Sequence, residues 1–376
     1  MKIGILTQPL KNNYGGILQA YALQTYIEKN YDCDAELIDY MPKNEFVGKK
    51  LLVTRLKRLG TYIKNFGKYY VLRKNRGNQE IKKREFDKFF ELHMVTSSWK
   101  VNSAESLAEH SGEYDAVMVG SDQTWNPFVS KDGIFLLDWL KDRGVSKIAY
   151  APSIGVSRIP DEWHERYKAA LSGFDALSCR ERGGAGFLSE LLGKDVEFVI
   201  DPTLLLTPDD WEEISTPEEV DGPYLLTYFL GDNKAHRKAV EKIAKEKNLK
   251  IVALPVSYLE TKNKGIDKRY VGPGGFITLI KNASFVCTDS FHGTMFSINF
   301  GKDFVSFTKR NDADINSDNN RLYDALGVFG LQDRLCIKGE FSDSAVDYAL
   351  VNERLGKLRA SSRRYLDRAL STADKE

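Results

Sequence analysis

The stretch from Thr288 to Ser297 combines residue types suited to acid–base chemistry with a backbone suited to binding an anion. It follows the apolar run 285–287, which is typical of a short buried strand, and it leads into a helical pattern that opens at residue 295. Ligands bind at such strand ends in open α/β sheets, and a helix N-terminus there favours an anion, so His292 is a candidate general acid or base. The alternative is a histidine packed beneath a turn and paired with Asp289. The candidate binding residues of this stretch are Asp289, Ser290, Gly293 and Thr294.

A second polar stretch runs from Gly120 to Pro127, at the end of the buried-strand pattern of residues 114–120. Sugar sites need polar groups that make paired hydrogen bonds and an aromatic face. Ser121, Asp122 and Trp125 supply these groups, so the stretch favours a carbohydrate site. The alternative is structural: Asp122 would cap a helix, and the following Asn-Pro pair would close a turn.

A glycine loop, Asn13-Tyr14-Gly15-Gly16, lies between the first predicted strand, 2–7, and the first predicted helix, 17–27. Glycines at such a place let the backbone approach a ligand closely, which makes Asn13, Tyr14 and Gly15 candidate binding residues. The loop is not GxGxxG, and it has no P-loop lysine. A plain tight turn is the alternative.

Alternating strand and helix patterns position these stretches. One series of strand patterns falls at 2–7, 35–40, 114–120, 147–151, 176–182 and 196–200, and a second at 224–229, 250–254, 285–287 and 304–307. Alternation of this kind predicts parallel sheets, hence two Rossmann-like domains, 1–215 and 216–345, with a ligand cleft between them. A closing helical pattern, 346–376, is long enough to cross back to the first domain.

Composition bounds the class of protein. Of 376 residues, 42% are hydrophobic and 28% are charged, which is usual for soluble globular proteins, and no apolar run approaches the ~18–20 residues of a membrane helix. The N-terminus does not resemble a signal peptide. The four cysteines form no CxxC pair, which argues against a zinc site or a disulfide framework and fits a reducing cytoplasm. We therefore expect a cytoplasmic protein without a metal requirement.

One segment is strongly cationic. Residues 46–95 contain 14 Lys and Arg against four Asp and Glu, whereas the rest of the chain contains 40 against 49. Apolar residues recur at helical spacing among the basic ones, so a helical insertion is predicted that could contact an anionic membrane surface. An acidic partner, or a solvated helix packed on the core, would explain the pattern equally well. Nucleic acid is not favoured, because no binding motif accompanies the charge.

Taken in order, five segments resemble the polysaccharide pyruvyl transferase family over about residues 1–335. They are Asn13–Gly16 with Leu18–Gln24, Gly120–Pro127, Ser178–Glu181, Asp201–Leu205, and Asp289–Thr294 with Phe300–Lys302. The resemblance implies a fold similar to GT-B glycosyltransferases. It also implies transfer of pyruvate from phosphoenolpyruvate to two hydroxyls of one sugar, as a cyclic ketal, with no cofactor. Acceptors in the family are often sugars of bacterial surface polysaccharides, such as exopolysaccharide and capsule, commonly as lipid-linked precursors.

The resemblance also implies roles for residues. His292 matches the family's motif histidine and is the expected general acid, Arg180 the main anion clamp, and Asp122 the group that orients or deprotonates the acceptor hydroxyl. Asn13 and Tyr14 would line the acceptor side. Weaker candidates for contacts with the donor anion are Lys302 and Arg321, for which a structural salt bridge is the alternative. Ser290 departs from the pattern, because some relatives carry an arginine there.

Under this resemblance, the basic segment suits an enzyme that meets a polyprenyl-diphosphate-linked sugar at the inner leaflet, as a peripheral membrane protein. Two other functions remain open from the sequence. One is a GT-B glycosyltransferase that uses a nucleotide sugar. The other is a non-catalytic glycan-binding family member, in which Ser290 would mark lost chemistry.

Overall fold

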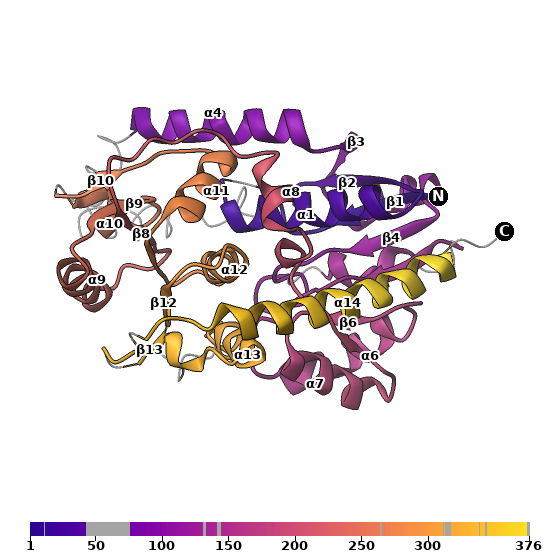
Figure 1. Cartoon of the computed structure of the whole chain (residues 1–376). Helices are drawn as coiled ribbons and strands as arrows, with labels where there is room; N and C mark the ends of the chain where they lie inside the picture. The colour runs from indigo at the N-terminus through magenta and orange to yellow at the C-terminus, as the bar shows by residue number, and fades with distance from the viewer. Residues whose placement is uncertain are drawn as a thin grey trace, which may run out of the picture.

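The computed structural model describes residues 1–10, 12–42, 76–130, 133–140, 144–263, 265–310, 312, 317–337, 339–342 and 344–373. Two parallel sheets, each flanked by helices, lie beside one another (Figure 1). The first precedes residue 215 in the chain, and the second follows it.

The first sheet has its earliest strand in the middle. Its order is β3 (Thr96–Val101), β2 (Asp34–Tyr40), β1 (Lys2–Leu6), β4 (Ala116–Val119) and β5 (Ser146–Ala149), all parallel. Beyond β5, a bridge from Ile148 to Ala176 leads to the paired strands β6 (Ser178–Cys179) and β7 (Glu197–Phe198). The helices are α1 (Tyr14–Asn30), α4 (Arg76–His93), α5 (Ala104–Glu109), α6 (His164–Leu171), α7 (Arg182–Leu192) and α8 (Pro208–Glu212). Short 3-10 helices are η1 (Ser111–Glu113), η2 (Ile134–Leu136), η3 (Asp138–Leu140), η4 (Asp161–Trp163) and η5 (Pro202–Leu204).

The second sheet repeats this order. It runs β10 (Asp267–Lys268), β9 (Lys250–Ala253), β8 (Tyr224–Tyr228), β11 (Phe285–Thr288), β12 (Phe304–Phe307) and β13 (Leu335–Cys336), again all parallel. Its helices are α9 (Lys234–Glu246), α10 (Tyr258–Lys262), α11 (Pro273–Asn282), α12 (Phe291–Asn299) and α13 (Asn320–Phe329), with η6 (Gln332–Arg334). In both sheets the first strand lies centrally, and later strands are added first on one side of it and then on the other, which is the Rossmann order. The two Rossmann-like domains expected from the sequence are thus confirmed.

Three edge strands were not predicted from the sequence. Strand β3 carries polar residues at most positions, so it lacks the apolar pattern of the central strands. Strands β10 and β13 have two residues each, too few to show any periodicity.

Helix α4 lies across both domains (Figure 1). It contacts α11, and its Phe86 ring packs 4.8 Å from the ring of Tyr14 at the start of α1. Of the cationic insertion predicted at 46–95, nine of the 14 basic residues and none of the four acidic ones lie in 46–75, outside the described residues. The described part is therefore a nearly neutral helix that braces the two domains.

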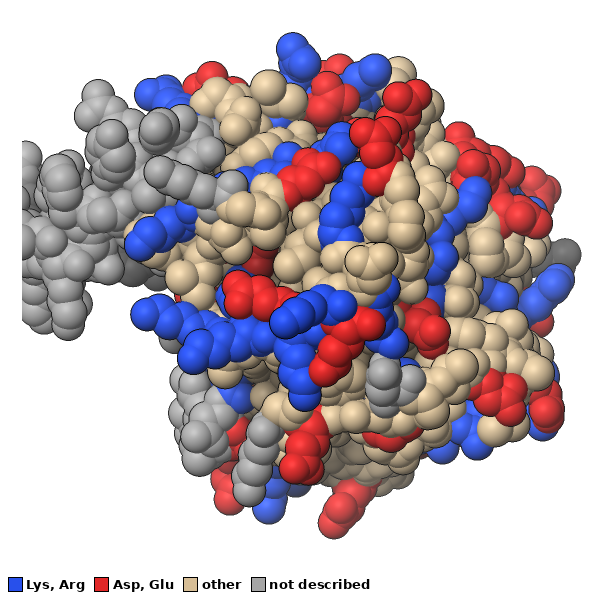
Figure 2. Space-filling view, turned by 60° about the vertical axis from the view of Figure 1, so that its left-hand side comes forward, with Lys and Arg blue, Asp and Glu red and all other residues tan. Residues whose placement is uncertain are grey.

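The face drawn in Figure 2 shows the same balance. Among the described residues, Lys and Arg side chains are interspersed there with Asp and Glu. None of the described helices is both long and apolar enough to cross a membrane.

The last helix, α14 (Tyr348–Ala373), runs from the second domain along the first, as predicted (Figure 1). Its Arg359 Nε donates to Leu204 O at 2.6 Å, and Tyr365 Oη donates to Ala149 O at 2.7 Å. Arg368 pairs with Glu197 at 2.6 Å. These contacts hold the two domains together on the side opposite α4.

Candidate functional site

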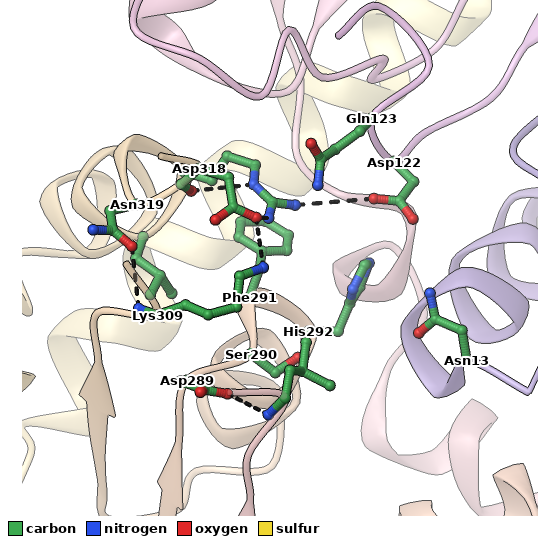
Figure 3. A pocket seen from close by; sticks show the side chains of 13 residues that line it. Asn13, Asp122, Gln123, Asp289, Ser290, Phe291, His292, Lys309, Asp318 and Asn319 are labelled. Carbon is green, nitrogen blue, oxygen red and sulfur yellow. Dashed lines mark hydrogen bonds and ion pairs between the residues drawn. The ribbon is translucent and has the colours of Figure 1, made fainter. Parts of the chain in front are cut away.

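A cavity of about 210 Å³ lies where the carboxyl ends of the two sheets face each other (Figure 3). It is lined by Asn13, Asp122, Gln123, Leu230, Asp289, Ser290, Phe291, His292, Lys309, Asp318, Asn319, Arg321 and Leu322. The first domain contributes the loops after β1 and β4, and the second contributes the loops after β8, β11 and β12 with the starts of α12 and α13. This is the edge of the sheets at which α/β proteins bind ligands.

Helix α12 begins at Phe291, four residues earlier than the sequence pattern indicated. Ser290 is its N-cap, with Oγ accepting from Gly293 N at 3.3 Å. A Cβ at position 293 would lie 2.5 Å from Thr288 Oγ1, so glycine lets this first turn pack on the end of β11. His292 consequently lies in the first turn of a helix that points its positive end at the cavity.

The partner of His292 is not Asp289. Asp289 accepts from Leu230 N at 2.6 Å and from Gly231 N at 2.9 Å, and so orders the loop after β8. Burial raises the pKa of Asp289, although these two backbone donors oppose the shift. His292 Nε2 instead lies 3.5 Å from Asp201 Oδ2, a carboxylate of the first domain.

Asp201 is the centre of a buried polar cluster. Arg180 Nη1 donates to Asp201 Oδ2 at 2.8 Å, and Ser121 Oγ donates to the same oxygen at 3.3 Å. Burial by itself would raise the pKa of Asp201, but His292, Arg180 and the hydrogen bonds from Thr203 hold that pKa well below its usual range. Asp201 is therefore a buried, charged carboxylate that lies beside the imidazole of His292 across the domain boundary, although His292 Nε2 makes no hydrogen bond to the described residues.

Arg180 does not line the cavity. Its side chain is 2% exposed and stacks on the ring of Phe291 at 4.2 Å, so that ring separates it from the cavity. Arg180 Nη2 lies 4.0 Å from Asp122 Oδ1. The guanidinium supports the site from behind and does not face it.

Asp122 lies between two arginines. Its Oδ1 is 4.0 Å from Arg180 and 3.9 Å from Arg321 Nη1. Its backbone is in the left-handed region, at φ 72°, which costs about 1–3 kcal/mol for a residue other than glycine. Ser153 N donates to Asp122 O at 2.8 Å and helps to hold this conformation. Strain of this kind is concentrated at functional sites, and here it aims the carboxylate at the cavity.

The opposite wall carries two cations on one carboxylate (Figure 3). Asp318 pairs with Lys309 Nζ at 2.7 Å and, more closely, with Arg321 Nη2. Burial would raise the pKa of Asp318, but Arg321 and Lys309 together lower it. An incoming oxyanion would meet both cations at this point.

Several predicted binding residues lie away from the cavity. Trp125 is fully buried, with Nε1 donating to Phe135 O at 3.1 Å, and Lys302 Nζ donates to Lys281 O at 2.7 Å. Thr294 bonds to Ser306 Oγ beneath the sheet edge.

Two residues of the glycine loop, Tyr14 and Gly15, pack inside the protein and do not line the cavity. The Tyr14 ring stacks on Phe276 at 4.6 Å, and its hydroxyl donates to Val271 O at 2.7 Å, so it joins the domains inside the core. Gly15 packs against the histidine: a Cβ there would lie 2.1 Å from His292 Nδ1. Only Asn13 of this loop lines the cavity.

The residues that sequence reasoning missed are Gln123, Phe291, Lys309, Asp318, Asn319 and, behind the cavity, Asp201. Lys309 could have been predicted from the sequence, because it follows β12 as Asp289 follows β11. Ligands bind at the carboxyl ends of parallel strands, and this applies to both residues. Asp201 was recognised as part of a motif. Its pairing with His292 joins two domains, so no local pattern in the sequence indicates it.

Comparison with known proteins agrees with this architecture. UDP-GlcNAc 2-epimerase from Methanocaldococcus jannaschii superposes with a TM-score of 0.50 at 13% identity, covering 96% of this chain and 100% of that chain. The enzyme from Neisseria meningitidis, bound to UDP-GlcNAc, gives 0.50 at 8% identity, covering 95% and 99%. At such identities the similarity shows the fold alone, which is GT-B-like. No curated protein matches the chain.

A family model described as polysaccharide pyruvyl transferase matches residues 13–309. The match spans the glycine loop, the ends of strands β2 to β12, the His292 helix and Lys309. The chain therefore belongs to the polysaccharide pyruvyl transferase family.

Proposed function

We propose that the cavity binds phosphoenolpyruvate and that the protein transfers its pyruvyl group to two hydroxyls of one sugar, forming a cyclic ketal. The observation that carries this proposal is the grouping at one cavity of a histidine beside a buried carboxylate, a helix N-terminus and two cations. Family membership already makes the protein a transferase with a sugar or polysaccharide acceptor.

The donor carries about three negative charges in a small volume. Lys309 and Arg321 would bind its oxyanions in exchange for Asp318, and the first turn of α12 would add its N-terminal backbone amides. Ser290 cannot supply the positive charge of the arginine present in some relatives. Lys309 and Arg321, which reach the same cavity from the other side, would replace that charge.

The chemistry then needs one proton at the methylene carbon. His292, which lies beside Asp201, would donate it and leave an oxocarbenium-like centre at C2. The first sugar hydroxyl attacks C2, phosphate leaves, and the second hydroxyl closes the ketal. Over the whole reaction the two hydroxyls lose two protons. One replaces the proton that His292 gave to the new methyl group, and the other leaves on phosphate, so charge and atoms balance. Asp122, which faces the cavity, would accept a proton from the attacking hydroxyl.

A thermal-shift titration tests donor binding. Phosphoenolpyruvate should stabilise the full-length protein, by about 2.7 kcal/mol at a hundredfold excess over Kd. Lys309→Ala and Arg321→Ala should abolish the shift. Lys302→Ala is the matched control, because Lys302 is a basic residue away from the cavity, and it should keep the shift. Stabilisation by UDP or UDP-sugars, without any by phosphoenolpyruvate, would refute the proposal in favour of a nucleotide-sugar transferase.

Turnover tests the role of His292. With a panel of bacterial surface oligosaccharides as acceptors, the wild type should release phosphate from phosphoenolpyruvate. His292→Ala should bind the donor as the wild type does but release phosphate at least a hundredfold more slowly, the usual minimum loss of a general acid. Equal turnover by both proteins would remove His292 from the mechanism.

We also propose that the enzyme works in the cytoplasm at the inner leaflet, on a polyprenyl-diphosphate-linked precursor of a capsule or exopolysaccharide. The charge of residues 46–75, nine basic and no acidic side chains, supports this proposal. The full chain should sediment with anionic liposomes but not with zwitterionic ones at 0.15 M salt (about the physiological ionic strength). If a variant with those nine residues changed to Gln sediments equally, the membrane contact is wrong.

A further inference from the structure

A second cavity, of about 440 Å³, also lies between the two domains. Phe128 and residues 156–161 line it from the first domain, and Asp312, Ser317 and Asn320 line it from the second. These segments follow β4, β5 and β12, so the second cavity lies on the same sheet edges as the first.

The two cavities share a wall in the second domain. Asn319 lines the first cavity, and its Nδ2 donates to Oδ1 of Asp312, which lines the second, at 2.8 Å. The next residue, Asn320, lines the second cavity at the start of α13. Consecutive residues of one helix start therefore face the two spaces.

The first domain closes the same wall. Gln123 Oε1, at the first cavity, accepts from Asn126 Nδ2 at 2.7 Å, and Asn126 Oδ1 accepts from Phe128 N, at the second cavity, at 2.9 Å. Gly155, at φ 68°, packs on this pair, and a Cβ there would lie 2.4 Å from Asn126 Nδ2. Only glycine lets residues 156–161 begin at this position.

The lining of the second cavity suits a neutral sugar. Its apolar part is formed by Phe128, Val156, Ile159 and Pro160. The side chain of Asn320 makes no hydrogen bond to the rest of the described chain, so both ends of its amide are available to sugar hydroxyls. Arg158 pairs with Asp161 at 3.1 Å, and Asp312 adds a second carboxylate. Among the described residues of the lining, this balance of one cation to two carboxylates disfavours a phosphate or a diphosphate.

We propose that the second cavity is a saccharide subsite that holds the acceptor beyond the sugar ring being modified. The proposal rests on the donor lying in the first cavity. The volume of the second cavity lies in the range of sites that bury a ligand larger than one sugar ring, ~300–1,000 Å³. The acceptor is thus a neutral oligosaccharide chain of at least two units, with its reacting sugar at the shared wall.

An array of bacterial surface glycans, neutral and uronic-acid-containing, tests the proposal with the full-length protein. Wild type should be retained by neutral glycans of two or more units. Phe128→Ala and Asn320→Ala should each weaken retention about tenfold, as expected on loss of one well-placed contact. Val129→Ala is the matched control, since Val129 is exposed beside Phe128 and does not line the cavity, and it should bind as wild type.

Retention unchanged in both variants, retention of acidic glycans alone, or retention of no glycan would overturn the subsite. Asn320→Ala removes no hydrogen bond within the described chain, so it keeps the test valid if Phe128→Ala fails to fold. Donor binding is read separately, by the thermal shift with phosphoenolpyruvate. A normal shift with glycan binding unaffected by the variants rejects the subsite alone, whereas variant-sensitive glycan binding without any shift rejects the donor proposal alone.

Discussion

Replacing Asp201 with asparagine should strongly destabilise the protein. The substitution keeps the shape of the side chain but removes its charge. The partners of both oxygens are donors: Thr203 N and Oγ1 on one side, and Arg180 and Ser121 on the other. An amide NH2 group in either orientation would therefore face a donor. The substitution also leaves the buried guanidinium of Arg180 without its closest counter-charge.

The magnitude follows from the geometry. At 2.8 Å and an effective dielectric constant of about 20, the attraction between Asp201 and Arg180 is about 6 kcal/mol. Desolvation of the two groups offsets several kcal/mol of this, and breaking such a buried pair costs about 3–5 kcal/mol. Because the folded pKa of Asp201 lies below its unfolded value, this stability is present above about pH 4 and is lost as the pH falls through the folded pKa.

Urea unfolding followed by circular dichroism at pH 7 gives the change in free energy. Asp87→Asn is the matched control: its carboxylate forms an exposed pair with Lys83 one helical turn away, and it should lose only about 0.3–0.5 kcal/mol. Asp201→Asn combined with Arg180→Met should lose less than the sum of the single losses, because no uncompensated guanidinium remains. A loss for Asp201→Asn as small as that of the control would refute the buried cluster as described.

Two further substitutions, each with a control, test the packing of Gly15 against His292 and the burial of the charge on Lys82. Gly15→Ala would place a methyl group against His292, so it should lower donor turnover and reduce the free energy of unfolding in urea by about 1–3 kcal/mol. Gly186→Ala is the control: Gly186 has open space around it in α7, and the substitution should gain about 0.5–1 kcal/mol. Equal effects of the two substitutions would contradict the close approach of Gly15 to His292. Burial lowers the pKa of Lys82 to about 8, so the unfolded chain keeps this proton to higher pH and stability should rise between about pH 8 and 10.4. Lys82→Met should abolish that rise and gain about 1–3 kcal/mol at pH 7, because the lost contacts of the ammonium with the Tyr14 and Phe86 rings offset part of the relieved desolvation. The exposed neighbour Lys83→Met should change stability by less than about 0.5 kcal/mol. A Lys82→Met protein less stable than the wild type would show that these ring contacts outweigh the penalty of burying the charge.

Local patterns determined much of this protein. Strand and helix periodicity predicted two parallel sheets. The central strands of such a sheet are buried on both faces, so each one shows a continuous apolar run that can be recognised without knowing its neighbours. Their places after predicted strands led to His292 and Asp122, and the glycine loop led to Asn13; all three line the cavity. The order of the short motifs was sufficient to identify the family, because each motif can be recognised within a few residues of sequence.

Tertiary structure decided which polar groups meet. Trp125 and Tyr14 resemble ligand-binding aromatics in sequence, but an aromatic ring serves a core as well as a sugar, and only packing distinguishes the two. The alternative weighed from the sequence paired His292 with the local Asp289, whereas the nearest carboxylate in the structure is that of Asp201, 91 positions earlier in the other domain. Charged groups pair according to their distance in space. Neither the periodicity nor the spacing of residues in the sequence indicates which strand ends of the two sheets lie within a few ångströms of each other.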